Sequence, residues 1–209
     1  MHSAQRALLL AAVAAVALAF PAAAQARPAI EHDRLAYWPQ RVESAREWSL
    51  FMHGTDRFRP RLIVEHWTEG DRRYQAVNFW NSGPDRPWAH FLIDRRGRVT
   101  QFASLTTLAR QAMGVSPWAI GIEHVGRSDG EVMTNPAMRR ASYELTCWLR
   151  RRLDIPTRGV IGHAEITSHP RFHLTPAGWE WIHSTGHTFH PDFSRPTMQR
   201  YRERLRTVC

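Results

Sequence analysis

The sequence contains no lysine. All 28 of its basic residues are arginines, against 19 aspartates and glutamates, so the formal net charge of the 209-residue chain is +9. Any task that a related protein gives to a lysine must therefore be done here by another residue. An excess of positive charge suits an anionic partner such as cell wall, acidic polysaccharide or nucleic acid, and charge alone does not choose among these polymers.

Cysteine is nearly absent as well, since Cys147 and Cys209 are the only two. Cys147 falls in a predicted helix, and Cys209 is the last residue of the sequence. In an exported protein a disulfide between them is permissible, and it would fasten the C-terminal helix to the rest of the domain. The sequence does not show whether the two sulfur atoms are close, so the pairing stays open.

A long apolar run occurs once, near the N-terminus. A short segment that contains Arg6 is followed by an apolar stretch over 7–20, and then by Ala22, Ala24 and Ala26. This pattern predicts a cleavable signal peptide over residues 1–26 and a secreted or periplasmic protein. The stretch is short for a membrane span and has no basic flank, and no cysteine lies near the cleavage site. We therefore expect neither a stable membrane anchor nor a lipoprotein.

The rest of the sequence alternates strand and helix patterns, which predicts an α/β fold: a single domain with a central mixed β-sheet flanked by helices. Strands are predicted at 61–67, 88–103 (a hairpin with its turn at Gly97), 119–126 and 158–163. Helices are predicted at about 41–50, from Pro136 to about 155 with Asn135 as the N-cap, and at 195–206. Residues 167–185 are expected to form a long loop. We divide the chain into the signal peptide, an N-terminal extension over 27–60 and a catalytic domain over 61–209.

Histidines stand at the ends of two predicted strands, His66 in "LIVEHW" and His163 in "VIGH". A third group lies in "TGHTFHPDF" near the C-terminus, which contains His190 and Asp192. A strand end fixes an imidazole ring against a cleft, which suits a metal ligand. A catalytic zinc site needs three protein ligands and one open position, and His66, His163 and Asp192 would supply that set. Spacing alone makes this a suggestion.

The order of these segments resembles the zinc-dependent N-acetylmuramoyl-L-alanine amidases, the superfamily that includes the peptidoglycan recognition proteins. The resemblance spans about residues 61–192 and is carried by "LIVEHWTEG", "WAHFLIDRRGRVTQFA", "AIGIEHVG" and "GVIGHAEI". Each motif is moderately specific, and their shared order strengthens the resemblance. It implies an amidase-like fold with peptidoglycan or muropeptides as substrate. The expected reaction is cleavage of the amide between the lactyl group of N-acetylmuramic acid and L-alanine.

Carried over residue by residue, the resemblance implies that His66, His163 and Asp192 bind Zn²⁺. Glu123 falls on the glutamate of the "AIGIEHVG" motif and would act as the catalytic acid and base. His190 stands where the family has a lysine, and it would be a catalytic cation that stabilises the oxyanion as it develops.

The sequence also departs from the family pattern. The segment over 164–186 between the second and third ligands is long and rich in histidine, so the third ligand is either Asp192 or a nearby histidine such as His173 or His187. Gln111 stands where a histidine is common. The alternative function is a non-catalytic peptidoglycan-binding module on the same fold. No motif supports a nucleic-acid partner, and the sequence does not give the oligomeric state.

Overall fold

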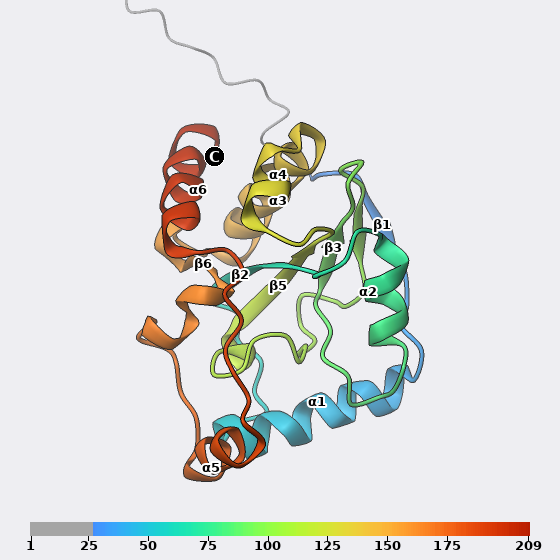
Figure 1. Ribbon diagram of the computed structural model, residues 1–209, viewed down its shortest axis with the longest axis vertical. Coiled ribbons are helices and arrows are strands. Elements are labelled where there is room, and N and C mark those ends of the chain that lie inside the picture. Colours follow the sequence, from blue (N-terminus) through green and yellow to red (C-terminus); the bar gives the residue numbers. More distant parts are fainter. Residues whose placement is uncertain (1–26) are drawn as a thin grey trace, which may run out of the picture.

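The computed structural model describes residues 27–209, so the predicted signal peptide lies outside the described residues. A six-stranded sheet forms the centre of the domain, with strand order β1-β4-β3-β5-β2-β6 (Figure 1). The strands are β1 (Ile30–His32), β2 (Leu62–Trp67), β3 (Phe91–Ile93), β4 (Val99–Gln101), β5 (Ala119–His124) and β6 (Val160–Gly162). Neighbouring strands are parallel except for the antiparallel pair β3 and β4, so the sheet is mixed. The predicted fold class is confirmed.

The strand β2, which lies between β5 and β6, is buried on both sides of the sheet. Leu62 and Val64 pack in one apolar cluster, whereas Ile63 packs in the main core. Successive side chains of a strand point to opposite sides, so His66 falls on the side of Leu62 and Val64, and Glu65 falls on the side of Ile63. We call these the groove side and the helix side of the sheet.

The predicted hairpin is formed by β3 and β4. Its turn has Gly97 at φ 76°, a left-handed conformation that glycine adopts without strain. The carboxylate of Asp94 accepts hydrogen bonds from the backbone N–H groups of Arg96 and Arg98, which closes the turn. The strand residues and the turn residues therefore both favour this hairpin.

Two long helices cover the helix side, α4 (Pro136–Leu153) and α6 (Arg195–Val208), and α3 (Asp129–Thr134) precedes them (Figure 1). The side chain of Asn135 caps α4 by accepting from the N–H groups of Ala137 and Met138, as the sequence predicts. Both predicted C-terminal helices are confirmed. Among residues 27–209, no helix is both long and apolar enough to cross a membrane.

The first part of the described chain belongs to the same sheet and core. β1 pairs with β4 at the edge of the sheet, and α1 (Trp38–His53) extends beyond the predicted 41–50. The helix α2 (Arg73–Trp80), on the right in Figure 1, was not predicted. The buried side chain of Arg41 joins these helices, because it donates to the carbonyl oxygens of Trp80 and, at 2.9 Å, Gly83.

The expectation of a long loop over 167–185 is wrong, because α5 (Pro176–Thr185) occupies its second half. Thr175 caps this helix by accepting from the N–H of Gly178 at 3.0 Å, and Pro176 occupies its first turn. These start signals are in the sequence, but the many histidines and tryptophans around them obscured the helical pattern. Trp181 packs edge-on against Trp48, with ring centroids 4.9 Å apart, and so fixes α5 against α1.

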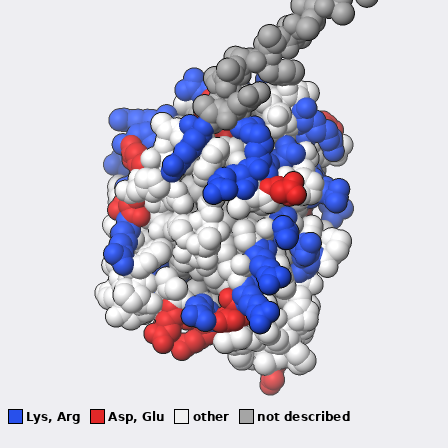
Figure 2. All heavy atoms as spheres, turned by 180° about the vertical axis from the view of Figure 1, so that it is seen from behind, with Lys and Arg blue, Asp and Glu red and all other residues white. Residues whose placement is uncertain are grey.

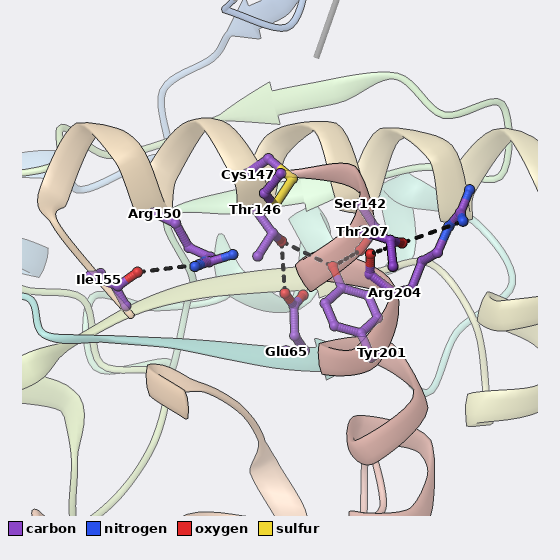
Figure 3. The surroundings of a disulfide bond; sticks show 10 residues. Glu65, Ser142, Thr146, Cys147, Arg150, Ile155, Tyr201, Arg204 and Thr207 are labelled. Carbon is purple, nitrogen blue, oxygen red and sulfur yellow. Dashed lines mark hydrogen bonds between the residues drawn. A yellow bond between two sulfur atoms is a disulfide. The ribbon is translucent and has the colours of Figure 1, made fainter. Parts of the chain in front are cut away.

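Cys147 and Cys209 form a disulfide that joins α4 to the end of α6 (Figure 3). A buried polar network lies beside it on the helix side. Thr146 donates to Glu65 at 2.9 Å, and the hydroxyl of Tyr201 lies 3.0 Å from that of Thr146. The disulfide and this network together tie both helices to β2.

Candidate metal centre

The ends of β2 and β6 bring two histidines together. The strands are parallel with Glu65 opposite Gly162, so His66 and His163, the next residues, stand side by side. Their Nδ1 atoms are 3.0 Å apart. Two imidazole nitrogens at this distance can share only one proton, so at least one of them presents a lone pair to the other.

Asp192 reaches the two rings from the segment that runs between α5 and α6. Gly162 allows this close passage, because a Cβ there would overlap the carbonyl oxygen of Phe193. The carbonyl oxygen of Asp192 also accepts from the N–H of Ala164 at 2.9 Å. Its carboxylate lies 3.2 Å from the Nδ1 atom of His66 and 3.2 Å from that of His163.

These three side chains fit a zinc ion. One ligand atom from each lies within 4.8 Å of the others, and His66 and Asp192 are buried. The Oδ1 atom of Asp192 has no hydrogen-bond partner among the described residues, although the Nδ1 atom of His163 is near it. Two imidazole nitrogens and one carboxylate oxygen form a donor set typical of catalytic zinc, which keeps a fourth position open.

The electrostatics of the group also suit a cation. Burial raises the pKa of Asp192, but the close contacts of its carboxylate with the rings of His163 and His66 outweigh burial and hold the pKa well below its usual range. Burial lowers the pKa of His66, yet the hydrogen bond to Asp192 and the charge of Glu123 raise it to about 9. Burial, helped by the charge of His66, lowers the pKa of His163 to about 4. A metal ion bound by this group would compete with protons for the same lone pairs.

Glu123 lies beside the three candidate ligands on the groove side. It is the register partner of His66 on β5, and its Oε2 atom is buried without a hydrogen-bond partner among the described residues. Burial raises its pKa to about 7; the charge of His66 lowers that pKa and the charge of Asp192 raises it. An unpaired carboxylate with such a pKa is suited to accept and return a proton near neutral pH.

A groove of about 350 Å³ opens above this group. Aromatic side chains form much of its wall, and the group with Glu123 and His190 forms its polar part. The aromatic residues are Trp67, Phe79, Trp80 and Trp88. A groove with apolar walls and a few convergent polar groups is typical of a ligand site.

Residues 56–174 of the chain match the N-acetylmuramoyl-L-alanine amidase family. The chain belongs to this family. The matched range includes β2, β5 and β6, and with them His66, Glu123 and His163. Asp192 lies beyond it, so its part in the site rests on the geometry described above.

Several solved structures share the fold. PlyL has a TM-score of 0.53 at 13% identity, covering 86% of this chain and 96% of PlyL. The hydrolase AmiA from Staphylococcus aureus has a TM-score of 0.50 at 18% identity, covering 88% of this chain and 85% of AmiA. The endolysin amidase LysCS from Clostridium intestinale has a TM-score of 0.50 at 20% identity, covering 67% and 84% of the two chains. No curated protein matches this chain.

In this amidase-family chain, Gln111 contacts the ring nitrogen of His66 that faces away from His163 and Asp192. Its Oε1 atom lies 2.7 Å from the Nε2 atom of His66. A carbonyl oxygen only accepts, so Nε2 carries the hydrogen and donates it to Gln111. Gly121 makes room for the amide, because a Cβ there would lie 2.9 Å from Gln111. The sequence marked Gln111 only as a departure from the family, and its contact with His66 was missed.

His190 lies at the rim of the groove and not in the ligand group. Its Nδ1 atom is 3.2 Å from the Oε1 atom of Glu69, and its ring stacks on His163 with centroids 5.4 Å apart. Nearly half of its side chain is exposed, at 47%. It can therefore reach a bound substrate while remaining ordered by its two neighbours.

The histidines weighed as alternative third ligands lie elsewhere. The backbone N–H of His173 bonds to Gly114, and the ring of His187 packs against Trp181 with centroids 5.6 Å apart. In the part of the chain that the structure describes, the potential metal group contains Asp192 and neither of these histidines.

Proposed function

We propose that this family member is an exported zinc amidase that cleaves the bond between the lactyl group of N-acetylmuramic acid and L-alanine in peptidoglycan or muropeptides. The observation that carries the proposal is the convergence of His66, His163 and Asp192 beside the unpaired carboxylate of Glu123 in one groove. In this proposal the three side chains hold the metal, and Glu123 performs the proton transfers.

Zinc bound at such a site supplies a Lewis acid that polarises a carbonyl and lowers the pKa of water. Glu123 accepts the proton of the attacking water on Oε2, the atom that has no other partner. The same carboxylate then delivers this proton to the nitrogen of the departing L-alanine. One residue therefore acts first as base and then as acid, and no second carboxylate is needed.

His190 has a supporting role at the rim. The resemblance places it at the sequence position of the family lysine, and Glu69 orients it through Nδ1. We propose that it donates a hydrogen bond to the oxygen that gains charge as the amide carbonyl is attacked. An exposed ring held by a single exposed carboxylate can adjust its position when substrate enters.

Export by a signal peptide over residues 1–26 is part of this proposal, as is a catalytic domain over 61–209 that the extension over 27–60 completes with β1 and α1. The wall-facing substrate requires a chain that leaves the cytoplasm, and the sequence pattern at the N-terminus supports such a route. Comparing the N-terminal residue of the protein recovered from the cell exterior with Ala22–Arg27 would test the cleavage site.

One experiment tests the reaction and the metal together. The full protein, expressed with its leader and purified after export, is analysed for zinc and incubated with purified sacculi. We expect about one zinc per chain, since three side chains form a single group, and stem peptides with a free N-terminal L-alanine. Binding to sacculi without release of peptide would favour the non-catalytic module. Glycan fragments in place of free stem peptides would contradict the proposed bond specificity.

A further inference from the structure

The positive charge of this protein is concentrated on two neighbouring helices. α4 and α6 each contain five arginines and one glutamate, so together they contribute a net charge of +8. The described residues also carry +8, because Arg6 is the only charged residue among the first 26 of a chain with a net charge of +9. The other 17 described arginines are thus balanced by 17 acidic residues.

The arginines of these helices are mostly exposed. We call the exposed ones the arginine face: Arg139, Arg140, Arg151, Arg152, Arg195, Arg200, Arg204 and Arg206. Arg139, Arg195 and Arg204 donate to neutral oxygen atoms of Met133, Ser168 and Thr207. Figure 2, which shows the molecule from behind, has most of its blue arginine atoms over the upper half.

Several arginines elsewhere form close ion pairs, as Arg202 of α6 does with Glu165. Arg46, Arg73 and Arg95 lie 2.6–2.7 Å from carboxylate oxygens of Asp56, Asp33 and Glu131. Such pairs cancel charge locally, so they attract a distant polyanion weakly. The net positive charge of the described residues therefore coincides with α4 and α6.

The two helices form one rigid support for these charges. The disulfide between Cys147 and Cys209 connects them, and Tyr201 of α6 contacts both Ser142 and Thr146 of α4 (Figure 3). A rigid array of cations loses less freedom on binding than a flexible one. The arginine face is therefore preorganised for a partner with repeated negative charges.

The arginine face is separate from the groove. Among the described residues, those that line the groove include no arginine at all. Charge on α4 and α6 therefore has no direct contact with the bond to be cleaved, and its effect on a small soluble substrate should be slight.

We propose that the arginine face binds the carboxylates of intact peptidoglycan and holds the protein on the insoluble wall. The choice of peptidoglycan rests on the proposed function, because stem peptides carry repeated carboxylates near the amide that the groove would take. A guanidinium group matches a carboxylate with two parallel hydrogen bonds. The summed positive charge of the face also attracts a hydrated polyanion, so no apolar contact is needed for attachment.

A lipid surface or a nucleic acid fits this face less well. The large apolar side chains that are exposed in the described chain are Tyr37, Leu50, Phe51, Tyr74, Phe79 and Trp179, and none of them lies on α4 or α6. A helix that lies in a membrane surface needs apolar side chains to insert, and single-stranded nucleic acids need aromatic rings for stacking. The arginine face offers charge without either.

Two matched quadruple variants test the proposal. The first replaces Arg139, Arg152, Arg200 and Arg206 with Gln, and the control replaces the exposed Arg57, Arg59, Arg96 and Arg171 with Gln. Both lower the net charge by four. Binding to purified sacculi stripped of phosphate polymers is measured by co-sedimentation at low and high salt, in a Glu123→Gln background that prevents digestion. Circular dichroism checks the fold of both quadruple variants, in the Glu123→Gln background and in the wild-type background.

We expect the first variant to bind sacculi on the order of tenfold more weakly at low salt and the control to change by less than about twofold, because exposed charge pairs each contribute little but act together. In the wild-type background, kcat/KM on a small soluble muropeptide should stay the same for both variants. Activity on sacculi should fall only for the first.

Equal losses in the two variants would reduce the effect to net charge and overturn the proposal, as would no loss in either. Binding that disappears when phosphate polymers are stripped would reassign the face to those polymers. Tighter binding to phosphatidylglycerol vesicles or to DNA than to sacculi would reassign it to lipid or nucleic acid. A wild type that binds sacculi through this face but releases no stem peptide would contradict the proposed amidase activity and leave the present proposal intact.

Discussion

His66 and Glu65 are neighbours on β2, yet their side chains serve opposite sides of the sheet. On the groove side, His66 meets His163 and Asp192, and oxygen atoms of Asp192 and Glu123 are left without hydrogen-bond partners among the described residues. On the helix side, the Oε1 atom of Glu65 accepts from Thr146, which also contacts Tyr201. The Oε2 atom of Glu65 lies 3.7 Å from the Nε2 atom of His124 and has no hydrogen-bond partner among the described residues either, but it is enclosed in the core. On the same strand, the side chain of His66 is placed to bind a ligand, and the side chain of Glu65 takes part in the packing of the helices.

The difference shows how one strand can serve two purposes. Buried polar atoms without partners destabilise the folded chain unless something binds them. Those of Asp192 and Glu123 belong to residues that line the open groove, where a metal or a substrate can bind them. Polar atoms paired across helices hold α4 and α6 in place and contribute to stability. Changes on the groove side should therefore affect zinc and turnover, and changes on the helix side should affect unfolding.

The largest effect is expected from the three candidate ligands. His66→Ala, His163→Ala and Asp192→Ala should each lose most bound zinc, and activity on sacculi should fall by at least about a hundredfold, since even residues outside the ligand set of a metal cost up to that much. Zinc analysis and peptide release measure both. His187→Ala is the control and should keep both. If Asp192→Ala kept its full zinc content and His187→Ala lost zinc, the third ligand would be His187 and not Asp192.

Glu123→Gln should come next. The amide has the shape of the carboxylate but cannot accept the water proton, so turnover should fall by roughly 10²–10⁴-fold while zinc stays bound. The midpoint of thermal unfolding should not fall, because burial already disfavours the charged form of Glu123, whose pKa is about 7. Wild-type turnover of muropeptide by this variant would show that Glu123 has no catalytic part.

The disulfide tests the other side of the comparison. Cys147→Ser with Cys209→Ser removes a link between residues 62 apart in sequence, and the free energy of unfolding should fall by about 2–4 kcal/mol. Zinc content and kcat at 25 °C should not change, since neither cysteine touches the groove. Urea titration gives the stability, and the wild type with reductant should behave like the variant. Loss of zinc at 25 °C would show that the two sides are not separable.

The smallest effect is expected from Gln111→Leu, which removes the acceptor for the Nε2 hydrogen of His66. Without it the ring can turn, so zinc affinity should fall by about 10–100-fold. Competition with a chromophoric chelator measures this on the metal-free protein, independently of activity. Gln111→Glu keeps an acceptor in place and should bind zinc at least as well as the wild type. Equal affinities in Gln111→Leu and the wild type would show that the contact does not orient His66.

The elements that the sequence predicts best are those with a strong local signal. The apolar run before His66 and the Asn135–Pro136 start of α4 determine their structures almost without tertiary help. β1 has only three residues, and its place at the sheet edge depends on β4, so no local pattern could reveal it. α5 has clear start signals in Thr175 and Pro176, but the histidine- and tryptophan-rich sequence around them hides the helical period.

The site divides in the same way. Strand-end histidines and a family resemblance are enough to nominate His66, His163 and Asp192, and the structure brings all three together. The contact between Gln111 and His66 depends on the chain passing beside Gly121, and the approach of Cys147 to Cys209 depends on the packing of α4 against α6. Both contacts join segments that are far apart in sequence, so the spacing of residue types along the chain cannot predict them.

Gly162 contributes no atom that could bind or react, yet the site depends on it. Any side chain at this position would collide with the backbone of Phe193 and displace the segment that carries Asp192. A saturation mutagenesis screen that scores only cell-wall hydrolysis would therefore rank Gly162 beside the ligands themselves. Intolerance to substitution identifies positions that matter. The structure is needed to distinguish a residue that binds or reacts from one, such as Gly162, whose small size allows another segment to pass.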